Sequence, residues 1–95
     1  MHIAHLIWDS FNIAHIAKHN VTQEEVEETC QDQIGELEAK FGRILLIGKT
    51  KADRFLTICL DPEGNDDYYP VTARAASRKE RQLINEKEVT TTNDR

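Results

Sequence analysis

The sequence has little of what defines several protein classes. Among 95 residues there are two cysteines, two prolines and one tryptophan, and only 6% are aromatic. No apolar run approaches the roughly 20 residues that a membrane-spanning helix needs. The first residues also lack the cationic start and long apolar core of a signal peptide. We therefore expect a cytoplasmic protein without a membrane partner.

Motifs for several kinds of chemistry are also missing. Cys30 and Cys59 show no CxxC spacing, and each lies in a pattern where cysteine packs as a small hydrophobic residue. Gly48-Lys49-Thr50 lacks the upstream glycine of a phosphate-binding P-loop. No Ser/His/Asp arrangement or reactive cysteine stands out. The sequence therefore predicts no cofactor.

The composition that remains is typical of one globular domain. Hydrophobic residues make up 39% of the chain and charged residues 31%. A chain of this size buries roughly two thirds of its unfolded surface, which is enough to fold without a metal or a disulfide. The net charge of −5 argues against strong non-specific binding to nucleic acid.

Capping signals predict two helices in the first third of the chain. Asp9 and Ser10 are both competent N-caps, and Asn20 suits the end of the helix that they open. Thr22 and Glu25 form a T-x-x-E capping box. The two helices are expected over residues 10–19 and 22–31.

A second capping box predicts the last helix. Ser77 and Glu80 have the S-x-x-E spacing, and the helix that they open is expected to end near residue 88. Residues 89–95 are polar and rich in threonine, which is typical of a frayed tail. Residues 1–88 are therefore expected to form a single domain.

Apolar runs predict five strands, and short turns separate the last four. Such short connections require antiparallel hairpins, because parallel strands need long crossovers. The predicted order is βααββββα, an α+β domain dominated by a C-terminal antiparallel meander. Helices should cover one face of this sheet and leave the other partly free. The expected strands are residues 2–8, 34–40, 43–49, 54–60 and 68–75.

Charge is segregated along the chain. Residues 22–38 contain seven acids and no base, whereas residues 40–54 contain five bases and one acid. Residues 71–81 carry four cations against one anion. A concentrated cationic segment on an acidic chain is expected to meet an anion. The anion is a phosphate backbone, an acidic partner chain or acidic residues of the same fold.

Three arginines are candidates for phosphate recognition. Arg43 and Arg54 each begin a predicted strand and Arg74 ends one, so their side chains can converge in an antiparallel meander. Guanidinium suits phosphate because it is always charged and donates two parallel hydrogen bonds. The alternative is that these arginines pair with the acidic helix and solvate the surface.

Two histidines share one side of the first helix. His15 and His19 have i, i+4 spacing, with Lys18 beside them. Such a pair can ligate zinc, but a site needs three or four ligands and no H-E-x-x-H motif is present. Proton transfer near neutral pH is a second interpretation, and surface histidines without a function are a third.

A tyrosine pair opens the last predicted strand. Tyr68 and Tyr69 can stack on unpaired bases, as single-stranded RNA recognition requires. The alternative is packing within a hairpin, which is common for aromatic residues at a strand end.

A series of short motifs runs through residues 6–88 in a fixed order. The motifs are Trp8-Asp9, Lys18-His19-Asn20-Val21, Glu24-Glu25-Val26-Glu27-Glu28, Gly42-Arg43, Ile47-Gly48-Lys49-Thr50, Arg54-Phe55-Leu56, Val71-Thr72-Ala73-Arg74 and Ser77-Arg78-Lys79-Glu80-Arg81. In order and spacing this series resembles the BrnT-like toxin family. The resemblance implies a RelE-like fold and a ribonuclease toxin that a cognate antitoxin, encoded by the adjacent gene, neutralises. DNA contact is expected only through the toxin–antitoxin complex, which represses its own promoter.

The resemblance also assigns positions and marks departures. Arg54 and Arg74 match the family's strand arginines, and His19 matches the histidine after its first helix. Glu80-Arg81 matches the Glu-Arg pair of the last helix. Many members carry a basic residue in the strand just before the Ala-Arg pair, where this chain has Tyr69 or Pro70. Members are also often basic, whereas this chain is acidic.

Two functions are consistent with these residues. The first is a metal-independent endoribonuclease in which the RNA's own 2′-hydroxyl is the nucleophile. The second is a non-catalytic module that binds a protein partner through the same cationic face. The candidate catalytic residues are Arg74, Arg54, Arg43, His19 and Lys18, and the candidate RNA-binding residues are Arg81, Arg78 and Tyr69.

Overall fold

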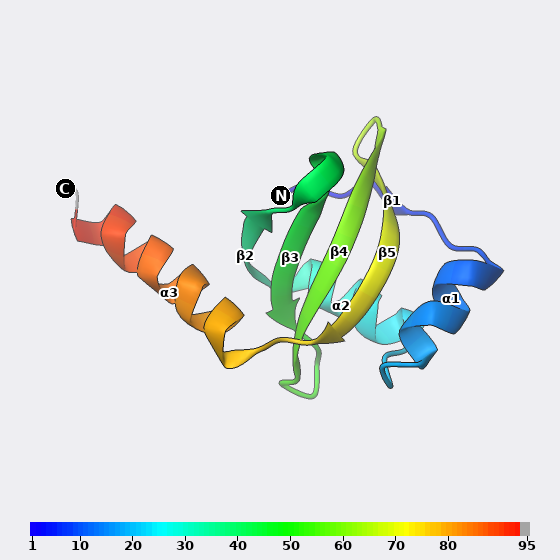
Figure 1. The fold of residues 1–95 in the computed structure, drawn as a ribbon, viewed down its shortest axis with the longest axis horizontal. Coiled ribbons are helices and arrows are strands. Elements are labelled where there is room, and N and C mark those ends of the chain that lie inside the picture. Colours follow the sequence, from blue (N-terminus) through cyan, green and yellow to red (C-terminus); the bar gives the residue numbers. More distant parts are fainter. Residues whose placement is uncertain (94–95) are drawn as a thin grey trace.

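Five strands in one sheet and three α-helices make up the computed structural model, which describes the backbone of residues 1–93 and the side chains of residues 1–85 (Figure 1). Within these residues, no helix has the length and apolar character needed to cross a membrane. The elements are β1 (His5–Leu6), α1 (Ser10–Ala17), α2 (Gln23–Gln31), β2 (Gln33–Glu38), the 3₁₀ turn η1 (Lys40–Gly42), β3 (Ile44–Lys49), β4 (Phe55–Gly64), β5 (Asp67–Ala75) and α3 (Arg78–Asn93).

The sheet has the strand order β1-β5-β4-β3-β2. Strands β2 to β5 form the predicted antiparallel meander, so the α+β assignment is confirmed. Strand β1 is much shorter than the predicted strand over residues 2–8, since only His5 and Leu6 are in register with residues of β5. It also pairs parallel to β5, with His5 opposite Asp67. The long connection through α1 and α2 makes this parallel pairing possible.

The capping signals determine where the first two helices begin. The Asp9 carboxylate caps α1 by accepting from the Asn12 backbone N–H, and the Asn12 side-chain oxygen accepts in return from the Asp9 backbone N–H, which completes a capping box that was not predicted. Thr22 and Glu25 form the predicted box at α2. Helix α1 ends at Ala17, two residues earlier than expected, and Asn20 takes the left-handed conformation with φ of 59°.

Helices α1 and α2 pack on one face of the sheet and enclose the core with it (Figure 1). Alternate residues of each strand point to this face, as the pleat of a strand requires. Because the opposite face of β3, β4 and β5 receives neither helix, its side chains stay half-buried for the most part. The buried core consists of Ile16, Val21, Val26, Leu46, Leu56, Ile58, Leu60 and Ala73.

Helix α3 leaves the end of β5 and runs away from the sheet (Figure 1). Its anchor is Ile84, which is 2% exposed and covers Gly35 of β2. The helix continues to Asn93, past the end predicted near residue 88, so most of the predicted polar tail is helical. Residues 94–95 of that tail lie outside the described residues.

The contact between α2 and β3 leaves no space for a side chain at Gly48. A Cβ atom there would lie 2.6 Å from the carbonyl oxygen of Asp32 and 2.7 Å from that of Thr29, at the C-terminal end of α2. We expect Gly48→Ala to lower the free energy of unfolding by at least about 2 kcal/mol in urea titrations, because backbone atoms must move. Gly35→Ala is the comparison, since the atoms nearest to its new Cβ, at 2.8 and 2.9 Å, belong to the Ile84 side chain and not to the backbone. An equal loss in both variants would contradict this account.

Candidate functional site

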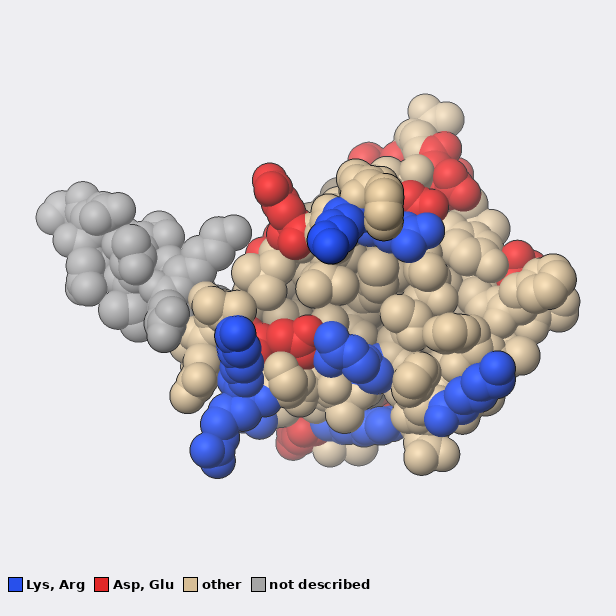
Figure 2. All heavy atoms as spheres, viewed as in Figure 1, with Lys and Arg blue, Asp and Glu red and all other residues tan. Residues whose placement is uncertain are grey.

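The sheet face opposite α1 and α2, called the open face below, carries the residues of interest. Leu56 and Ile58 of β4 point into the core, so Phe55, Thr57 and Cys59 point to the open face. Arg74 lies opposite Thr57 and therefore shares this face. Figure 2 shows Lys and Arg side chains, with Asp and Glu side chains among them, around the margin of the open face and a largely uncharged area in its centre.

Arg74 and Glu80 join strand β5 to helix α3. The guanidinium donates to the carboxylate through Nη1 at 2.8 Å and Nη2 at 2.6 Å, a bidentate pair. Glu80 also accepts from the Thr57 hydroxyl at 3.0 Å and from the Ser77 backbone N–H at 2.9 Å. The Ser77 hydroxyl accepts from the Glu80 N–H, so the predicted capping box is present. One carboxylate thus ties β4, β5 and α3 together.

These contacts lower the pKa of Glu80 from 4.5 to about 2. The hydrogen bond from Arg74 is the largest cause, and burial opposes it. The bonds from Ser77 and Thr57 lower the pKa further. A carboxyl group with so low a pKa is a poor proton acceptor at neutral pH, so Glu80 is unsuited to act as a general base.

The pair with Glu80 leaves part of the Arg74 guanidinium without a protein partner among the described residues. Arginine has five N–H donors. Two bind Glu80, and Nη1 also donates to the Ala75 carbonyl oxygen at 3.3 Å. The side edge, formed by Nε–H and the second Nη2–H, remains. The side chain is 44% exposed, so this edge is accessible to an anion while Glu80 holds the group in place.

Arg81 lies beside the Arg74–Glu80 ion pair, on the first turns of α3. Its guanidinium carbon is 4.1 Å from the centroid of the Phe55 ring, a cation–π contact. Ile34, Ile47 and Ile84 line a small cavity of about 100 Å³ next to this contact. Arg78 and Lys79 are exposed on the same first turn. The cationic segment of residues 71–81 therefore lies at one corner of the open face.

Arg43 faces the open side near the far end of the sheet. Ile44, which follows it, lies opposite Leu60, whereas Arg74 lies opposite Thr57. The two arginines are thus separated by about 13 Å along the strands, at roughly 3.3 Å per residue. The Arg43 Nε is buried and has no hydrogen-bond partner in the part of the chain that the structure describes.

Cys59 lies between these two arginines. Burial raises the pKa of its thiol above 9.0, and the positive charges of Arg43 and Arg74 only partly oppose this effect. The thiolate is therefore scarce at neutral pH, and Cys59 is a weak nucleophile.

Arg54 does not join the other two arginines. Its Nη1 donates to the Asn20 carbonyl oxygen at 2.7 Å and to the Glu25 carboxylate at 3.2 Å, on the side of the helices. Arg74 points to the opposite face, so the three predicted arginines form no single cluster. Pairing with the acidic helix, the alternative drawn from the sequence, is correct for Arg54. Its contact with Asn20 fixes the turn that follows Lys18 and His19.

The histidines and Lys18 lie on the surface at the end of α1. His15 and His19 are exposed, and their ring centroids are 5.6 Å apart. Within the described residues no group of three or more His, Cys, Asp or Glu side chains is placed to hold a metal. Lys18 is the C-cap of α1 and is exposed. These side chains are accessible, but on a different element from Arg74.

The two tyrosines have separate environments. Tyr68 packs against the core. The Tyr69 hydroxyl donates to the Asp9 carboxylate at 2.9 Å, at the start of α1. Burial and this bond raise the pKa of Tyr69, whereas the pKa of Asp9 is lowered, first of all by the Asn12 backbone N–H. Packing is thus the observed arrangement, although both rings remain half-exposed.

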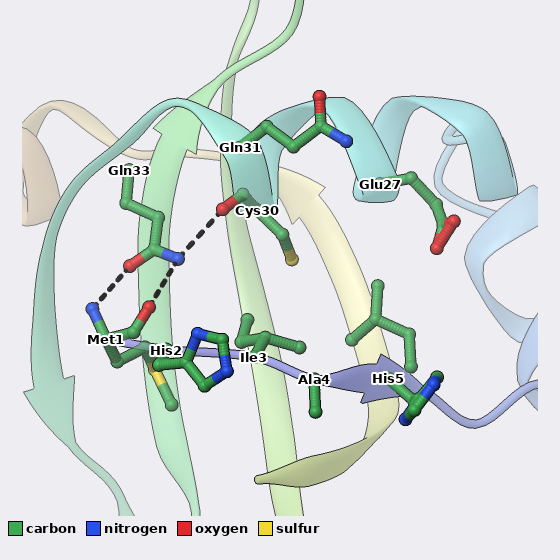
Figure 3. Close-up of a pocket in the computed structure, with 10 residues that line it drawn as sticks. Met1, His2, Ile3, Ala4, His5, Glu27, Cys30, Gln31 and Gln33 are labelled. Atoms are coloured by element: carbon green, nitrogen blue, oxygen red, sulfur yellow. Dashed lines mark hydrogen bonds between the residues drawn. The ribbon is translucent and has the colours of Figure 1, made fainter.

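A separate pocket of about 500 Å³ lies between the N-terminal segment and the end of α2. Figure 3 shows Gln33 at its rim, where it accepts from the Met1 amino group and donates to the carbonyl oxygens of Met1 and Cys30. Burial, followed by the charge of Glu27, raises the pKa of the Cys30 thiol to about 12, so this thiol is inert. No sequence pattern pointed to this pocket, because it depends on the path of the N-terminal segment.

Comparisons with known proteins do not assign the chain to a family. No model of a known protein family matches it, and a search of curated proteins finds no match. The functional argument therefore rests on the sequence motifs and on the geometry of the open face.

A fall in pH should weaken the Arg74–Glu80 ion pair, because it protonates the Glu80 carboxylate. A carboxyl whose pKa is lower in the folded state stabilises the fold above its unfolded pKa of 4.5, and this stabilisation is lost as the pH falls toward 2. We expect the free energy of unfolding to fall by about 1–2 kcal/mol over this range through Glu80, after allowance for the exposure of Arg74.

Urea titrations of Glu80→Gln across this range measure the effect. The variant should be less stable than the parent at neutral pH and should lose less on acidification. Glu63→Gln, at an exposed position of β4, is the control and should keep the parent's profile. If the free energy of unfolding of Glu80→Gln depended on pH as that of the parent does, the Arg74–Glu80 ion pair would not be the source of this stabilisation.

Proposed function

We propose that this chain is a metal-independent endoribonuclease of the BrnT-like toxin type, with a RelE-like fold and a site of action in the cytoplasm. A cognate antitoxin from the adjacent gene neutralises it, and the pair contacts DNA only as a complex. The motifs of residues 6–88 support this proposal from the sequence. The observation that carries it in the structure is the clamped Arg74 guanidinium, whose side edge faces solvent on the open face.

RNA cleavage without a metal needs a cation at the scissile phosphate. The 2′-hydroxyl attacks the phosphorus, negative charge builds up on the phosphoryl oxygens, and fixed donors stabilise that charge. In this proposal the side edge of Arg74 binds the two phosphoryl oxygens in a bidentate manner. Glu80 holds the guanidinium in one orientation, so no rearrangement is needed when the charge develops.

The other candidate residues have supporting roles in this proposal. Arg81 and Arg43, on the same face, contact neighbouring phosphates, as does Arg78 on the first turn of α3. The candidates for moving the proton of the 2′-hydroxyl or of the leaving oxygen are His19 and Lys18, which lie on the turn at the end of α1 and not on the open face itself. Arg54 acts as a positioning residue, because its bond to the Asn20 carbonyl oxygen holds the turn that bears His19.

A non-catalytic binding module is the second candidate. Glu80 neutralises the charge of Arg74, and the chain carries a net charge of −5. Tyr69 also occupies a position where family members often have a basic residue. These three features favour a face that binds a protein partner and leaves RNA intact. Purified protein that binds the product of the adjacent gene tightly without degrading RNA would support this candidate over the first.

Cleavage assays with purified protein distinguish Arg74 as a phosphate ligand from Arg74 as a structural residue. We expect Arg74→Ala to reduce the rate of RNA cleavage about 100-fold, as the loss of one charge-stabilising donor does in other active sites. Growth arrest on expression should be lost in parallel. Glu80→Gln keeps the guanidinium but removes the ion pair, so it should reduce the rate far less.

Circular dichroism at the assay temperature shows that both variants are folded. An Arg74→Ala protein that arrests growth as strongly as the parent would overturn the assignment. Equal losses of cleavage in Arg74→Ala and Glu80→Gln would mean that Arg74 acts only by holding α3 in place. A parent protein that leaves RNA intact would exclude the ribonuclease activity itself.

A further inference from the structure

Phe41 has a backbone conformation that is unusual for its residue type. Its φ is 63° and its ψ is 32°, in the left-handed region. Asparagine and aspartate tolerate this region because their short side chains bond to the local backbone, whereas an aromatic side chain is strained there. Phe41 is the exception among the non-glycine residues with positive φ, which are Asn20, Phe41, Asp53, Asn65 and Asp66.

Burial does not offset this strain. The Phe41 side chain is 87% exposed, the highest value among the large hydrophobic residues that the structure describes. It projects from η1, the tip that joins β2 to β3. A residue that neither favours its backbone conformation nor contributes to a core adds nothing to the stability of the fold. Such an outlier points to a role in binding.

Cations flank the ring on both sides. Lys40 precedes it and is exposed, and Arg43 follows Gly42 and faces the open side of the sheet. Aromatic rings between basic residues bind single-stranded nucleic acid, because the ring stacks on a base while the cations bind the adjoining phosphates. The η1 tip lies beyond Arg43, which is itself four positions along the strands from Arg74, so the tip and Arg74 are at opposite ends of the open face.

We propose that Phe41 is a base-stacking platform for single-stranded RNA, with Lys40 and Arg43 binding the phosphates on either side of the stacked base. This inference rests on the proposed function, because it takes RNA as the ligand of the open face. The RNA strand runs across the uncharged centre of that face (Figure 2), from the phosphate at Arg74 to the base at Phe41. The platform thus sets where the cleaved bond lies relative to a bound base.

A second exposed phenylalanine offers a matched control. Phe11 is 81% exposed on the first turn of α1, and the residues next to it are Ser10 and Asn12 rather than cations. A general effect of removing an exposed aromatic ring would be equal at both positions. A stacking site predicts an effect at Phe41 alone.

Fluorescence anisotropy with the full chain tests the platform. The probe is a short fluorescein-labelled single-stranded RNA of mixed sequence, 2′-O-methylated so that it cannot be cleaved. We expect Phe41→Asn to weaken binding about tenfold, which is the effect of losing one stacked base. The dependence of binding on salt should not change, because no phosphate contact is lost. Phe11→Asn should bind like the parent.

An abasic probe separates stacking from phosphate contacts. On the same sugar–phosphate chain without bases, the parent and Phe41→Asn should bind equally, whereas Lys40→Ala should weaken binding and reduce the salt dependence. Thermal unfolding should show Phe41→Asn at least as stable as the parent, because asparagine suits the left-handed turn. A lower stability would contradict the premise that the ring serves binding at the expense of the fold.

The possible failures are distinguishable. If the parent cleaves RNA and Phe41→Asn binds the base-containing probe equally well, the platform is refuted and the proposed function stands. An equal loss on both probes would also refute stacking. If Phe41→Asn keeps RNA binding but loses the antitoxin, the ring is a protein anchor instead. A parent that neither binds nor cleaves RNA overturns both proposals.

Discussion

The carboxylate of Glu80 is the point on which the geometry of the open face depends. It accepts hydrogen bonds from residues of β4, β5 and the α3 N-terminus, so these elements cannot move independently without leaving a polar group unpaired. The same contact fixes the Arg74 guanidinium. A single acidic residue in a cationic segment therefore determines both the start of a helix and the orientation of the strongest candidate for anion binding.

Local signals in the sequence predicted the parts of the fold that depend on local contacts. The boxes at Thr22 and at Ser77 were predictable because each bond spans three residues. The parallel pairing of β1 was not, since it joins residues that no local pattern relates. Helix α3 was predicted too short because its polar composition resembles that of a frayed tail.

The candidate site was harder to predict, because it depends on which face of the sheet each residue occupies. A β-bulge at Val71 shifts the register between Cys59 and Leu60. Tyr69 and Arg74, which an unbroken strand would place on opposite faces, thereby come to the same face. Arg54 was grouped with Arg74 because both lie at the same end of the meander, and only the contacts of Arg54 with the helices separate them.

The parallel pairing of β1 with β5 has a consequence for the order of folding. His5 and Asp67 are 62 positions apart in the sequence. The pairing of β1 with β5 is therefore a long-range contact, whereas the rest of the sheet is built from hairpins between strands that are neighbours in the sequence. Closing so large a loop costs chain entropy that the hairpins do not incur. We therefore expect the meander to form first and β1 to dock last. During synthesis on the ribosome, the chain cannot complete its sheet until β5 has emerged.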